Sequence, residues 1–308
     1  MTLRVTFLGT AGAVPTIERN PSGIYLNREG EEFLFDCGEG TQRQMMRFHT
    51  GFTLSDIFIT HVHGDHVLGL AGLVETLSFN DRTDRLTIHT PRGTTSTIDA
   101  LLTALDTSPT FPLEVRQVNP GTVIRDGGDY EIRTFATDHR TRSVGYALIE
   151  DERKGRFDRE RAEELGVPVG PAFQRLHGGE SVELEDGTIV RPEQVVGPPR
   201  PGRKVVYTGD TRPSKAVAKA AEGADLLIHD GTFADDRAER ARETAHSTAR
   251  EAATVAGRAG AKRLALTHIS SRYAGGASAL AREADEAFEG EAFVATDGLE
   301  IDVPFPDE

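Results

Sequence analysis

Short apolar runs bounded by turn-forming residues recur along the whole chain and predict a series of β-strands. These runs cover residues 3–9, 23–28, 31–38, 56–60, 85–90, 130–137, 143–150, 204–209, 225–230, 263–268 and 291–298. Stretches with helical periodicity follow several of them, at 67–79, 97–105, 213–222, 245–260 and 279–288. Hairpin-like strand pairs mixed with strand–helix units indicate an α/β protein with mixed sheets.

Residues 151–203 interrupt this pattern. The stretch is charged, rich in glycine and proline, and has no strong period. One interpretation is a long surface loop, with His177 as a loop residue, but interior stretches of this length without regular pattern are usually functional. No internal repeat occurs at a fixed period, so a solenoid is not indicated.

The chain is strongly acidic and contains few lysines. The formal net charge of the 308 residues is −14, and the 35 basic residues are 30 arginines and only 5 lysines. Ordinary solubility would account for the acidity, but acidity combined with scarce lysine favours adaptation to high salt. A negative net charge argues only weakly against a nucleic-acid partner, because it does not report the local field inside a cleft lined by metal ions and arginines.

Composition also bears on the cellular compartment. No apolar run approaches the ~18 residues that a membrane helix needs, and the first residues lack the basic region and cleavage site of a signal peptide. The single cysteine, Cys37, cannot form an internal disulfide, which fits a reducing compartment. We therefore expect a cytoplasmic protein with no membrane partner.

The segment HVHGDH at 61–66 directly follows the apolar run at 56–60. Alternate side chains of an extended chain share a side, so His61, His63 and Asp65 are expected to project together. His66 falls outside this alternation, so its side chain is expected to bind a metal ion from a different direction. Imidazole and carboxylate groups suit Zn²⁺, and four potential ligands in six residues exceed what one ion normally takes from a short loop.

Further candidate ligands occupy equivalent places later in the chain. Asp138 and His139 follow the run at 130–137, Asp210 follows the run at 204–209, and His268 ends the run at 263–268. Side chains just past the carboxyl ends of strands are where α/β folds gather their sites. Each alone could be a turn residue or a satisfied polar group, but together they supply the remaining ligands for two metal ions.

These motifs resemble a known family. HxHxDH followed by distant histidine, aspartate and histidine is similar to the metallo-β-lactamase superfamily. FLGTAGAVPTIERNPSG at 7–23, DCGEGTQRQ at 36–44, TGDTRP at 208–213, AHST at 245–248 and THISSRY at 267–273 resemble ribonuclease Z, a family of tRNA 3′-processing endonucleases. The resemblance runs from residue 3 to residue 300, nearly the whole chain.

The resemblance implies seven ligands for two Zn²⁺ ions in each subunit: His61, His63 and His139 for one ion, Asp65, His66 and His268 for the other, and Asp210 as a bridge. It implies that residues 1–308 form one metallo-β-lactamase-like domain, an αβ/βα sandwich of two mixed sheets with outer helices. Residues 151–203 would be an inserted, protruding arm that grips precursor tRNA away from the active site. The family relation further implies a homodimer.

Two positions depart from the family pattern. The family loop P-x-K-x-R-N reads PTIERN at 15–20, so Ile17 stands in place of the lysine and Arg19 becomes the better candidate for a substrate contact. Asp230 stands where a glutamate is expected. We interpret His229 and Asp230 as supporting residues rather than ligands.

The expected chemistry is hydrolysis of a phosphodiester held between two metal ions. Asp65 is the candidate general base, the alternative being that it is only a ligand. His246, with Thr248, resembles the pair that the family places near the departing 3′-oxygen, so His246 is the candidate general acid; a structural role is the alternative. Ser247 also fits a helix N-cap.

Three functions are compatible with these residues. The first is a zinc endoribonuclease that cuts precursor tRNA after the discriminator base, leaving a 3′-hydroxyl and a 5′-phosphorylated trailer. The second is a small-molecule hydrolase of the same superfamily, such as a phosphodiesterase, an arylsulfatase-like enzyme or a lactamase, for which residues 151–203 have no evident use. The third is a scaffold or RNA-binding subunit without catalysis, which predicts eroded ligands, whereas all seven positions are intact.

Overall fold

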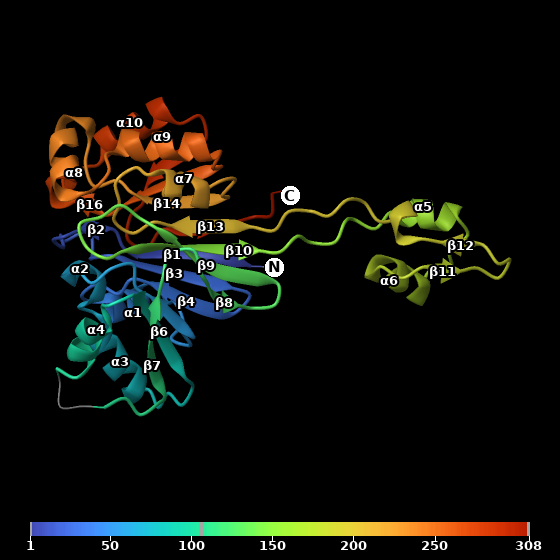
Figure 1. The fold of residues 1–308 in the computed structure, drawn as a ribbon, viewed down its shortest axis with the longest axis horizontal. Helices are drawn as coiled ribbons and strands as arrows, with labels where there is room; N and C mark the ends of the chain where they lie inside the picture. Colours follow the sequence, from blue (N-terminus) through green and yellow to red (C-terminus); the bar gives the residue numbers. More distant parts are fainter. Residues whose placement is uncertain (1, 105–107, 307–308) are drawn as a thin grey trace. The chain divides into compact units, whose positions relative to one another are not determined.

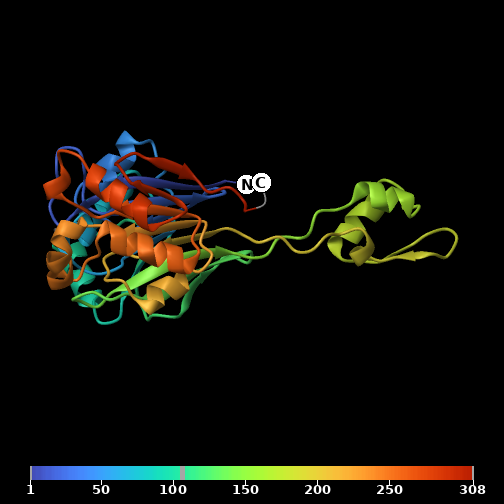
Figure 2. The same cartoon turned by 90° about the horizontal axis from the view of Figure 1, so that it is seen from above.

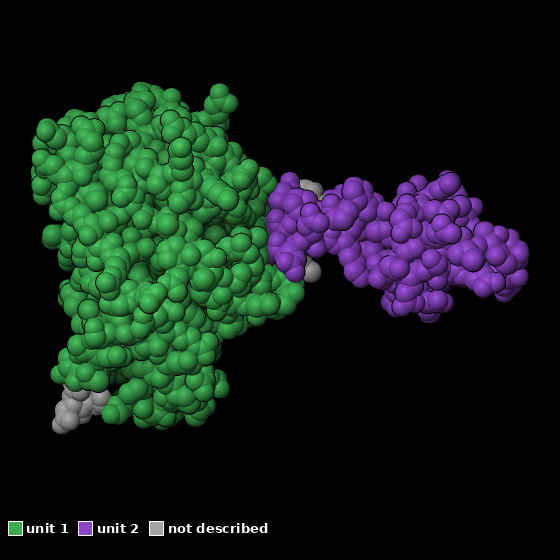
Figure 3. Space-filling model, viewed as in Figure 1, with its two compact units in different colours: residues 1–149, 203–304 green, residues 150–202, 305–308 purple. Residues whose placement is uncertain are grey.

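The computed structural model describes residues 2–104 and 108–306. The chain forms two compact units, residues 1–149 with 203–304 and residues 150–202 with 305–308 (Figure 3). Within the described ranges, no helix is both long and apolar enough to cross a membrane.

Two seven-stranded mixed sheets form the first unit. From edge to edge, the first sheet consists of β18 (Glu300–Asp302), β1 (Leu3–Gly9), β3 (Gly23–Arg28), β4 (Glu31–Phe35), β5 (Asp56–Phe58), β6 (Leu86–Pro91) and β7 (Leu113–Val118). The second consists of β17 (Glu291–Val294), β15 (Arg263–Thr267), β14 (Leu226–Asp230), β13 (Lys204–Tyr207), β10 (Val144–Glu150), β9 (Tyr130–Ala136) and β8 (Val123–Asp126). In each sheet four neighbouring strands are parallel: β4 to β7 in the first, and β13, β14, β15 and β17 in the second.

Alternation along the strands builds three apolar layers. In β4, Phe33 and Phe35 belong to the core between the sheets, whereas Leu34 faces the helices outside. The central core is aromatic, and the rings of Phe35 and Phe58 stack with their centroids 5.0 Å apart. Each sheet is therefore apolar on both faces, which explains the continuous apolar runs in the sequence.

Helices cover the outer face of each sheet (Figure 1). The first sheet packs against α1 (Thr41–Arg47), α3 (Leu70–Phe79) and α4 (Thr95–Leu102), and the second against α7 (Lys215–Ala220), α9 (Ala249–Ala259) and α10 (Ser278–Ala287). The N-terminus of α9 is fixed by a capping box in which Thr248 and Glu251 exchange hydrogen bonds. The expected sandwich of two mixed sheets with outer helices is confirmed.

Shorter elements lie at the loop ends of the strands. They are β2 (Ala11–Gly12), α2 (Gly64–Val67), η2 (Asp235–Arg237), α8 (Ala238–Thr244), β16 (Ile269–Ser270) and η3 (Ser271–Tyr273). Parallel pairing of β2 with β16 joins the glycine-rich turn after β1 to the segment after β15. This pairing brings Gly12 against the ring of His268, where a β-carbon on Gly12 would lie 2.6 Å from the Nδ1 atom.

The second unit has regular structure of its own (Figures 1 and 2). It contains α5 (Arg159–Glu164), α6 (Pro171–Gly178), the hairpin of β11 (Val182–Glu183) and β12 (Ile189–Val190), and η1 (Pro192–Gln194). A small core holds these elements together: Ala162, Val167, Leu176, Val182, Val190 and Val195 are all buried. The loop interpretation of His177 was wrong, because His177 lies in α6 and its Nε2 atom contacts the Gly155 carbonyl oxygen at 3.0 Å.

Candidate metal centre

The predicted ligands leave the sheets at the carboxyl ends of four strands. HVHGDH at 61–66 follows β5, His139 follows β9, Asp210 follows β13 and His268 follows β15. The two sheets bring these loops to a common edge, and the seven side chains gather there in two groups. Within each group, the ligand-type atoms all lie within 4.8 Å of one another.

The first group contains three histidines. The Nε2 atom of His61 lies 2.9 Å from the Nδ1 atom of His63, and the Nε2 atom of His139 lies 3.3 Å from the same Nδ1 atom. The Nδ1 atom of His139 donates a hydrogen bond of 2.9 Å to the carbonyl oxygen of Ala245. This bond fixes the tautomer of His139, so its Nε2 lone pair faces the group.

The second group contains Asp65, His66 and His268. The Nε2 atom of His268 lies 3.1 Å from the Oδ2 atom of Asp65, and the Nε2 atom of His66 lies 3.6 Å from that oxygen. The backbone amide of Ala13, in the glycine-rich turn, donates a hydrogen bond of 2.7 Å to the same carboxylate oxygen. The turn therefore orients Asp65.

Asp210 lies between the two groups and faces each with a different oxygen. Its Oδ2 atom is 3.5 Å from the Nε2 atom of His61 and 3.8 Å from that of His139. Its Oδ1 atom is 3.4 Å from the Nε2 atom of His66 and 3.3 Å from that of His268. The carboxylate is thus placed to serve both groups at once.

The donor atoms fit metal ions better than they fit one another. The Nε2 atom of His66 and the Oδ1 atom of Asp210 are buried and have no hydrogen-bond partner among the described residues. Buried polar atoms without partners are rare, and a cation is an ordinary explanation for them. Nitrogen and carboxylate oxygen donors in this number suit Zn²⁺.

A buried carboxylate outside the ligand set orients His66. The Oδ2 atom of Asp36 accepts hydrogen bonds from the Nδ1 atom of His66 and from the hydroxyl of Tyr207, both at 2.8 Å. Its Oδ1 atom accepts a bond of 2.7 Å from the backbone amide of Thr60. A carboxylate that fixes the ring of a ligating histidine is a usual part of metal sites.

Two residues of the centre have strained backbones. Asp36 has a φ of 56° and His268 a φ of 60°, both in the left-handed region. Side chains other than glycine rarely adopt this region, and such strain collects at functional sites.

Burial and neighbouring charges set the protonation states. Burial lowers the pKa of His61 and of His139, which keeps both rings neutral and able to donate a lone pair. For Asp65 and Asp210, burial acts against the charged form, but the surrounding histidines hold the pKa of each carboxyl below its usual value. Among the candidate ligands, Asp65 and Asp210 are therefore charged at neutral pH, and their negative charge attracts cations.

His246 lies at the side of this centre, in the loop between α8 and α9. Its ring stacks on that of His268 with the centroids 4.9 Å apart, and its Nδ1 atom lies 2.9 Å from the Oδ2 atom of Asp230. Burial disfavours the charged form, yet the carboxylates of Asp230 and Asp210 raise the pKa of His246 to about 9. A protonated imidazole thus lies beside a pocket of about 530 Å³, also lined by Gly12, Phe233, Arg240, His268 and Arg272.

The chain is similar to known proteins over its whole length. Residues 193–269 match the family model described as beta-lactamase superfamily domain, and residues 3–154 match the model described as anti-Pycsar protein Apyc1. The chain is 65% identical to a ribonuclease Z of Natronomonas pharaonis over 308 residues, which is 100% of each chain. The chain belongs to the ribonuclease Z family.

Other members agree in sequence and in structure. A ribonuclease Z of Halobacterium salinarum is 64% identical over 307 residues, covering 100% of this chain and 99% of that protein. The crystal structure of human tRNase Z, short form, superposes with a TM-score of 0.69 at 28% identity, covering 98% of this chain and 100% of that chain. The resemblance inferred from the motifs is therefore confirmed, and so is the metallo-β-lactamase fold.

The structure corrects one expectation about the segment around His246, namely that Ser247 is the N-cap of the following helix. The hydroxyl of Thr248 accepts a hydrogen bond from the amide of Glu251 at the start of α9 and contacts the Oδ1 atom of Asp235 at 3.0 Å. Thr248 is therefore the N-cap of α9. Ser247 instead donates a hydrogen bond of 2.6 Å to the carbonyl oxygen of Thr211.

The structure also shows where Ile17 and Arg19 lie, the two residues singled out from the sequence in the loop at 15–20. Ile17 is 97% exposed. The guanidinium of Arg19 donates to the hydroxyl of Thr10 at 2.6 Å and to the carbonyl oxygen of Ala295. Arg19 thus ties the glycine-rich turn to the segment after β17, and burial lowers its pKa.

The role of Asp36 was not identified from the sequence, and only a supporting role was predicted for Asp230. Asp36 was not singled out, although it follows β4 as Asp210 follows β13. Asp230, interpreted as a supporting residue, is completely buried and accepts hydrogen bonds from the backbone amides of Thr211 and Thr232. One carboxylate oxygen of Asp230 also lies within 4.8 Å of ligand-type atoms of Asp210, His246 and His268.

Proposed function

We propose that this protein is a zinc-dependent endoribonuclease that cuts precursor tRNA on its 3′ side, after the discriminator base. The products would be a tRNA with a 3′-hydroxyl and a trailer with a 5′-phosphate. The observation that carries this proposal is the position of Asp210, whose two oxygens face two separate groups of nitrogen and oxygen donors. The names of the ribonuclease Z relatives and of human tRNase Z support RNA, and tRNA in particular, as the substrate.

Two Zn²⁺ ions per subunit fit the donor set. His61, His63 and His139 would hold one ion, Asp65, His66 and His268 the other, and Asp210 would bridge them. Bound there, the metal ions would supply Lewis-acid stabilisation of the phosphate charge and an acidified water. Tetrahedral to five-coordinate Zn²⁺ is consistent with three protein ligands plus a shared carboxylate.

Two side chains would handle the protons. Asp65 remains ionised because its pKa is lowered, so its carboxylate is available to accept a proton from the attacking water. The water oxygen forms a new bond to phosphorus as the bond between phosphorus and the 3′-oxygen of the tRNA breaks, which leaves the phosphate on the trailer. His246, protonated and hydrogen-bonded to Asp230, would donate a proton to that departing oxygen.

Residues 150–202, the greater part of the second unit, would be the tRNA-binding arm. Their own buried core supports a folded element rather than a loop. The three arginines of α5 and α6, Arg159, Arg161 and Arg175, are exposed and offer contacts to phosphates, although each also pairs with a glutamate.

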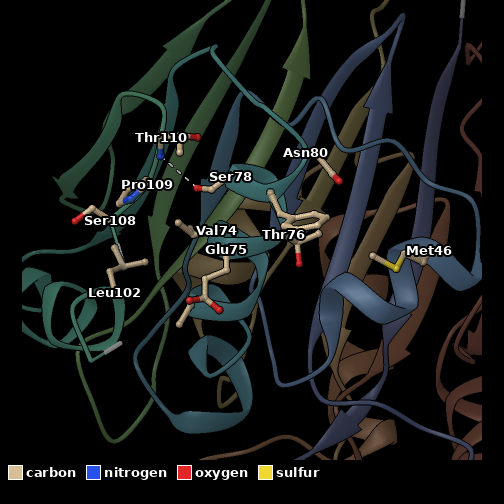
Figure 4. Close-up of a pocket in the computed structure, with 12 residues that line it drawn as sticks. Met46, Val74, Glu75, Thr76, Ser78, Asn80, Leu102, Ser108, Pro109 and Thr110 are labelled. Atoms are coloured by element: carbon tan, nitrogen blue, oxygen red, sulfur yellow. Dashed lines mark hydrogen bonds between the residues drawn. The ribbon is translucent and has the colours of Figure 1, made fainter. Parts of the chain in front are cut away.

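We further propose a homodimer formed through the outer face of α1 and α3. A pocket of about 720 Å³ opens there between Met46 of α1, Val74 and Glu75 of α3, and Pro109 (Figure 4). Phe79, which also lines it, is 88% exposed. An exposed apolar pocket of this kind fits a second copy of the chain. Phe79→Ser should shift the molar mass measured by light scattering from dimer to monomer.

The net charge and the single cysteine support two further proposals, adaptation to high salt and a cytoplasmic location. A net charge of −14 with 5 lysines supports adaptation to high salt. Cys37 is completely buried, and burial raises its pKa to about 12, so the thiol is unreactive. A tRNA substrate together with a lone thiol supports a cytoplasmic location.

The direct test uses precursor tRNA labelled at its 5′ end. The wild-type protein should produce one defined 3′ cut, a chelator should abolish it, and added Zn²⁺ should restore it. Elemental analysis should find two metal ions per chain in fully active protein. Asp65→Ala should lose activity by orders of magnitude while remaining folded. Hydrolysis of small phosphodiesters without any tRNA cleavage would instead favour a small-molecule hydrolase.

A further inference from the structure

The loop that carries His139 also carries two exposed arginines. The hydroxyls of Thr137 and Ser143 are hydrogen-bonded at 2.7 Å, which closes residues 137–143 into a loop between β9 and β10. Arg140 and Arg142 lie within this loop, and both are exposed. Because His139 belongs to the same loop, Arg140 and Arg142 lie within three residues of a candidate metal ligand.

This loop is anchored to the metal centre on both sides. The amide of Val144 donates a hydrogen bond of 3.0 Å to the carbonyl oxygen of Thr60, which directly precedes His61. The amide of Asp138 donates a bond of 3.0 Å to the hydroxyl of Thr211, next to Asp210. The position of the loop is therefore coupled to that of the ligands.

A third exposed arginine lies next to Arg142. The guanidinium of Arg142 donates a hydrogen bond of 3.2 Å to the carbonyl oxygen of Gly93, and Arg92 directly precedes that glycine. Gly93 has a φ of 82°, and a β-carbon there would lie 1.9 Å from the Nη1 atom of Arg142. The turn after β6 thus requires glycine to let Arg142 come so close.

Arg92 and Arg142 line a pocket of about 440 Å³, and Arg140 lies outside it, two residues before Arg142 in the loop. Its lining comprises Pro91, Arg92, Gly93, Gln117, Val118, Pro120, Arg142, Ser143 and Val144, and none of these is acidic. The Oε1 atom of Gln117 accepts a hydrogen bond of 3.0 Å from the amide of Gly93, which fixes the wall opposite the loop. The pocket therefore has a defined, positively charged wall.

The three arginines form a positively charged region in a chain that is negative overall. Among the described residues, no carboxylate forms an ion pair with Arg92, Arg140 or Arg142, whereas arginines elsewhere commonly do so. Asp138 is the one acidic residue of the loop 137–143. Three unpaired guanidinium groups in a chain of net charge −14 indicate a site for an anionic partner.

Sheet topology places this patch on the same edge as the metal centre. β5, β6 and β7 are parallel neighbours, so the loops that follow them leave the sheet together. The ligand loop follows β5, Arg92 follows β6, and Pro120 follows β7. Since neighbouring strands are about 4.8 Å apart, the patch extends sideways from the centre by one to two strand spacings.

We propose that Arg92, Arg140 and Arg142 form a basic shelf that binds backbone phosphates of the substrate RNA and positions the scissile bond at the metal centre. Arginine suits this task, because its planar fork binds phosphate oxygens in pairs and remains charged. The proposal rests on the proposed function, since it assigns RNA as the polymer that reaches this edge. The three arginines are positioning residues and take no part in bond breaking.

The test is a triple variant of the full chain, Arg92→Gln, Arg140→Gln and Arg142→Gln. Precursor-tRNA affinity, measured by filter binding with metal-loaded protein, should fall by about 10–100-fold at low salt. The slope of log affinity against log salt should become shallower by about 2–3, one unit for each phosphate that is no longer bound. Metal content and melting temperature should stay close to those of the wild type.

A matched control separates the shelf from overall charge. Lys219→Gln, Arg258→Gln and Arg282→Gln remove the same three charges from exposed positions on α7, α9 and α10. This control should keep the wild-type salt slope. Equal losses in both triple variants would overturn the shelf and leave only a general charge effect.

A second variant tests position rather than charge. Gly93→Ala keeps all three arginines but displaces the guanidinium of Arg142, so affinity should fall while the net charge is unchanged. If the wild type binds and cleaves precursor tRNA and the triple arginine variant does so equally well, the shelf is overturned but the proposed function is not. A wild type that neither binds nor cleaves precursor tRNA would overturn the proposed function and the shelf with it.

Discussion

The Nδ1 atom of His246 donates a hydrogen bond of 2.9 Å to the Oδ2 atom of Asp230, a carboxylate that is completely buried. The same carboxylate accepts hydrogen bonds from the amides of Thr211 and Thr232, so it is held between the loop after β13 and the loop after β14. Asp230 thus acts on His246 in two ways: it directs the Nδ1 atom inward and it stabilises the imidazolium.

Asp230→Asn should change the pH dependence of cleavage. Against the effect of burial, the carboxylates of Asp230 and Asp210 raise the pKa of His246 to about 9, so the proton donor is present below that pH and is lost as the pH rises through it. Without the charge, the pKa should fall toward the ordinary value of about 6.5, and the alkaline limb of the single-turnover rate should move to lower pH. Asp236→Asn, at an exposed position in η2, is the matched control. An unmoved alkaline limb would show that another group supplies the proton.

His246→Ala should slow the chemical step without emptying the metal centre. A general acid typically contributes about 10²–10⁴-fold, and the loss should appear in single-turnover cleavage of precursor tRNA. Metal content, measured by elemental analysis, should remain that of the wild type, because we assign His246 to the leaving group and not to ligation. An unchanged single-turnover rate would return His246 to a structural role.

The clustering of the candidate ligands could be predicted from the sequence because the segments that carry them follow strongly apolar strands. Asp36 obeys the same rule but acts through a tertiary contact with His66, 30 residues later, which no local pattern reports. The pairing of His246 with Asp230 depends likewise on loops that only the folded second sheet brings together. Ser247 fitted an N-cap in the sequence because two hydroxyl side chains stand next to each other there, and only the structure shows that Thr248 takes this place.

The unpredicted strands at the sheet edges and the unpredicted elements of residues 150–202 have different physical causes. β7, β8 and β18 lie at sheet edges, and most of their residues are exposed or only half-buried, so these strands lack the continuous apolar runs of the inner strands. The elements of residues 150–202 contain two to eight residues each, too short to show a period. Their small core is formed by single apolar residues scattered along the stretch, which resembles a polar loop in the sequence.

Asp36→Asn should weaken metal binding more than it weakens the fold. The substitution removes the charge that holds the Nδ1 atom of His66, and the loss of such a partner typically costs about 10–100-fold in metal affinity. Activity should therefore fall at limiting Zn²⁺ and recover when Zn²⁺ is added in excess. Tyr207→Phe, which removes a different hydrogen bond to Asp36, should have the smaller effect. Equal metal affinity in wild type and Asp36→Asn, measured by competition with a chelator, would contradict this role.

Replacing roughly residues 156–200 by a short flexible linker should separate binding from chemistry. The seven candidate ligands and the three apolar layers of the sheet unit lie outside the deleted stretch, so that unit should still fold and hold metal. Hydrolysis of a small activated phosphodiester should persist, but precursor-tRNA cleavage should fall sharply, because remote binding energy positions the scissile bond. Intact tRNA cleavage would show that residues 150–202 do not bind the substrate. Loss of both activities in folded, metal-loaded protein would place part of the active site in the deleted stretch.

Salt should have opposite effects on RNA binding and on stability. Screening weakens contacts to phosphates, so affinity for precursor tRNA should fall as KCl rises. The same screening relieves repulsion within a chain of net charge −14, so the free energy of unfolding, measured by urea titration, should rise with KCl. Sucrose serves as the control, because it stabilises by exclusion from the protein surface without screening charge. If the acidic surface is an adaptation to high salt, the gain in stability should dominate and activity should persist well above physiological ionic strength. Full activity confined to dilute buffer would contradict that adaptation and reduce the acidic surface to a matter of solubility.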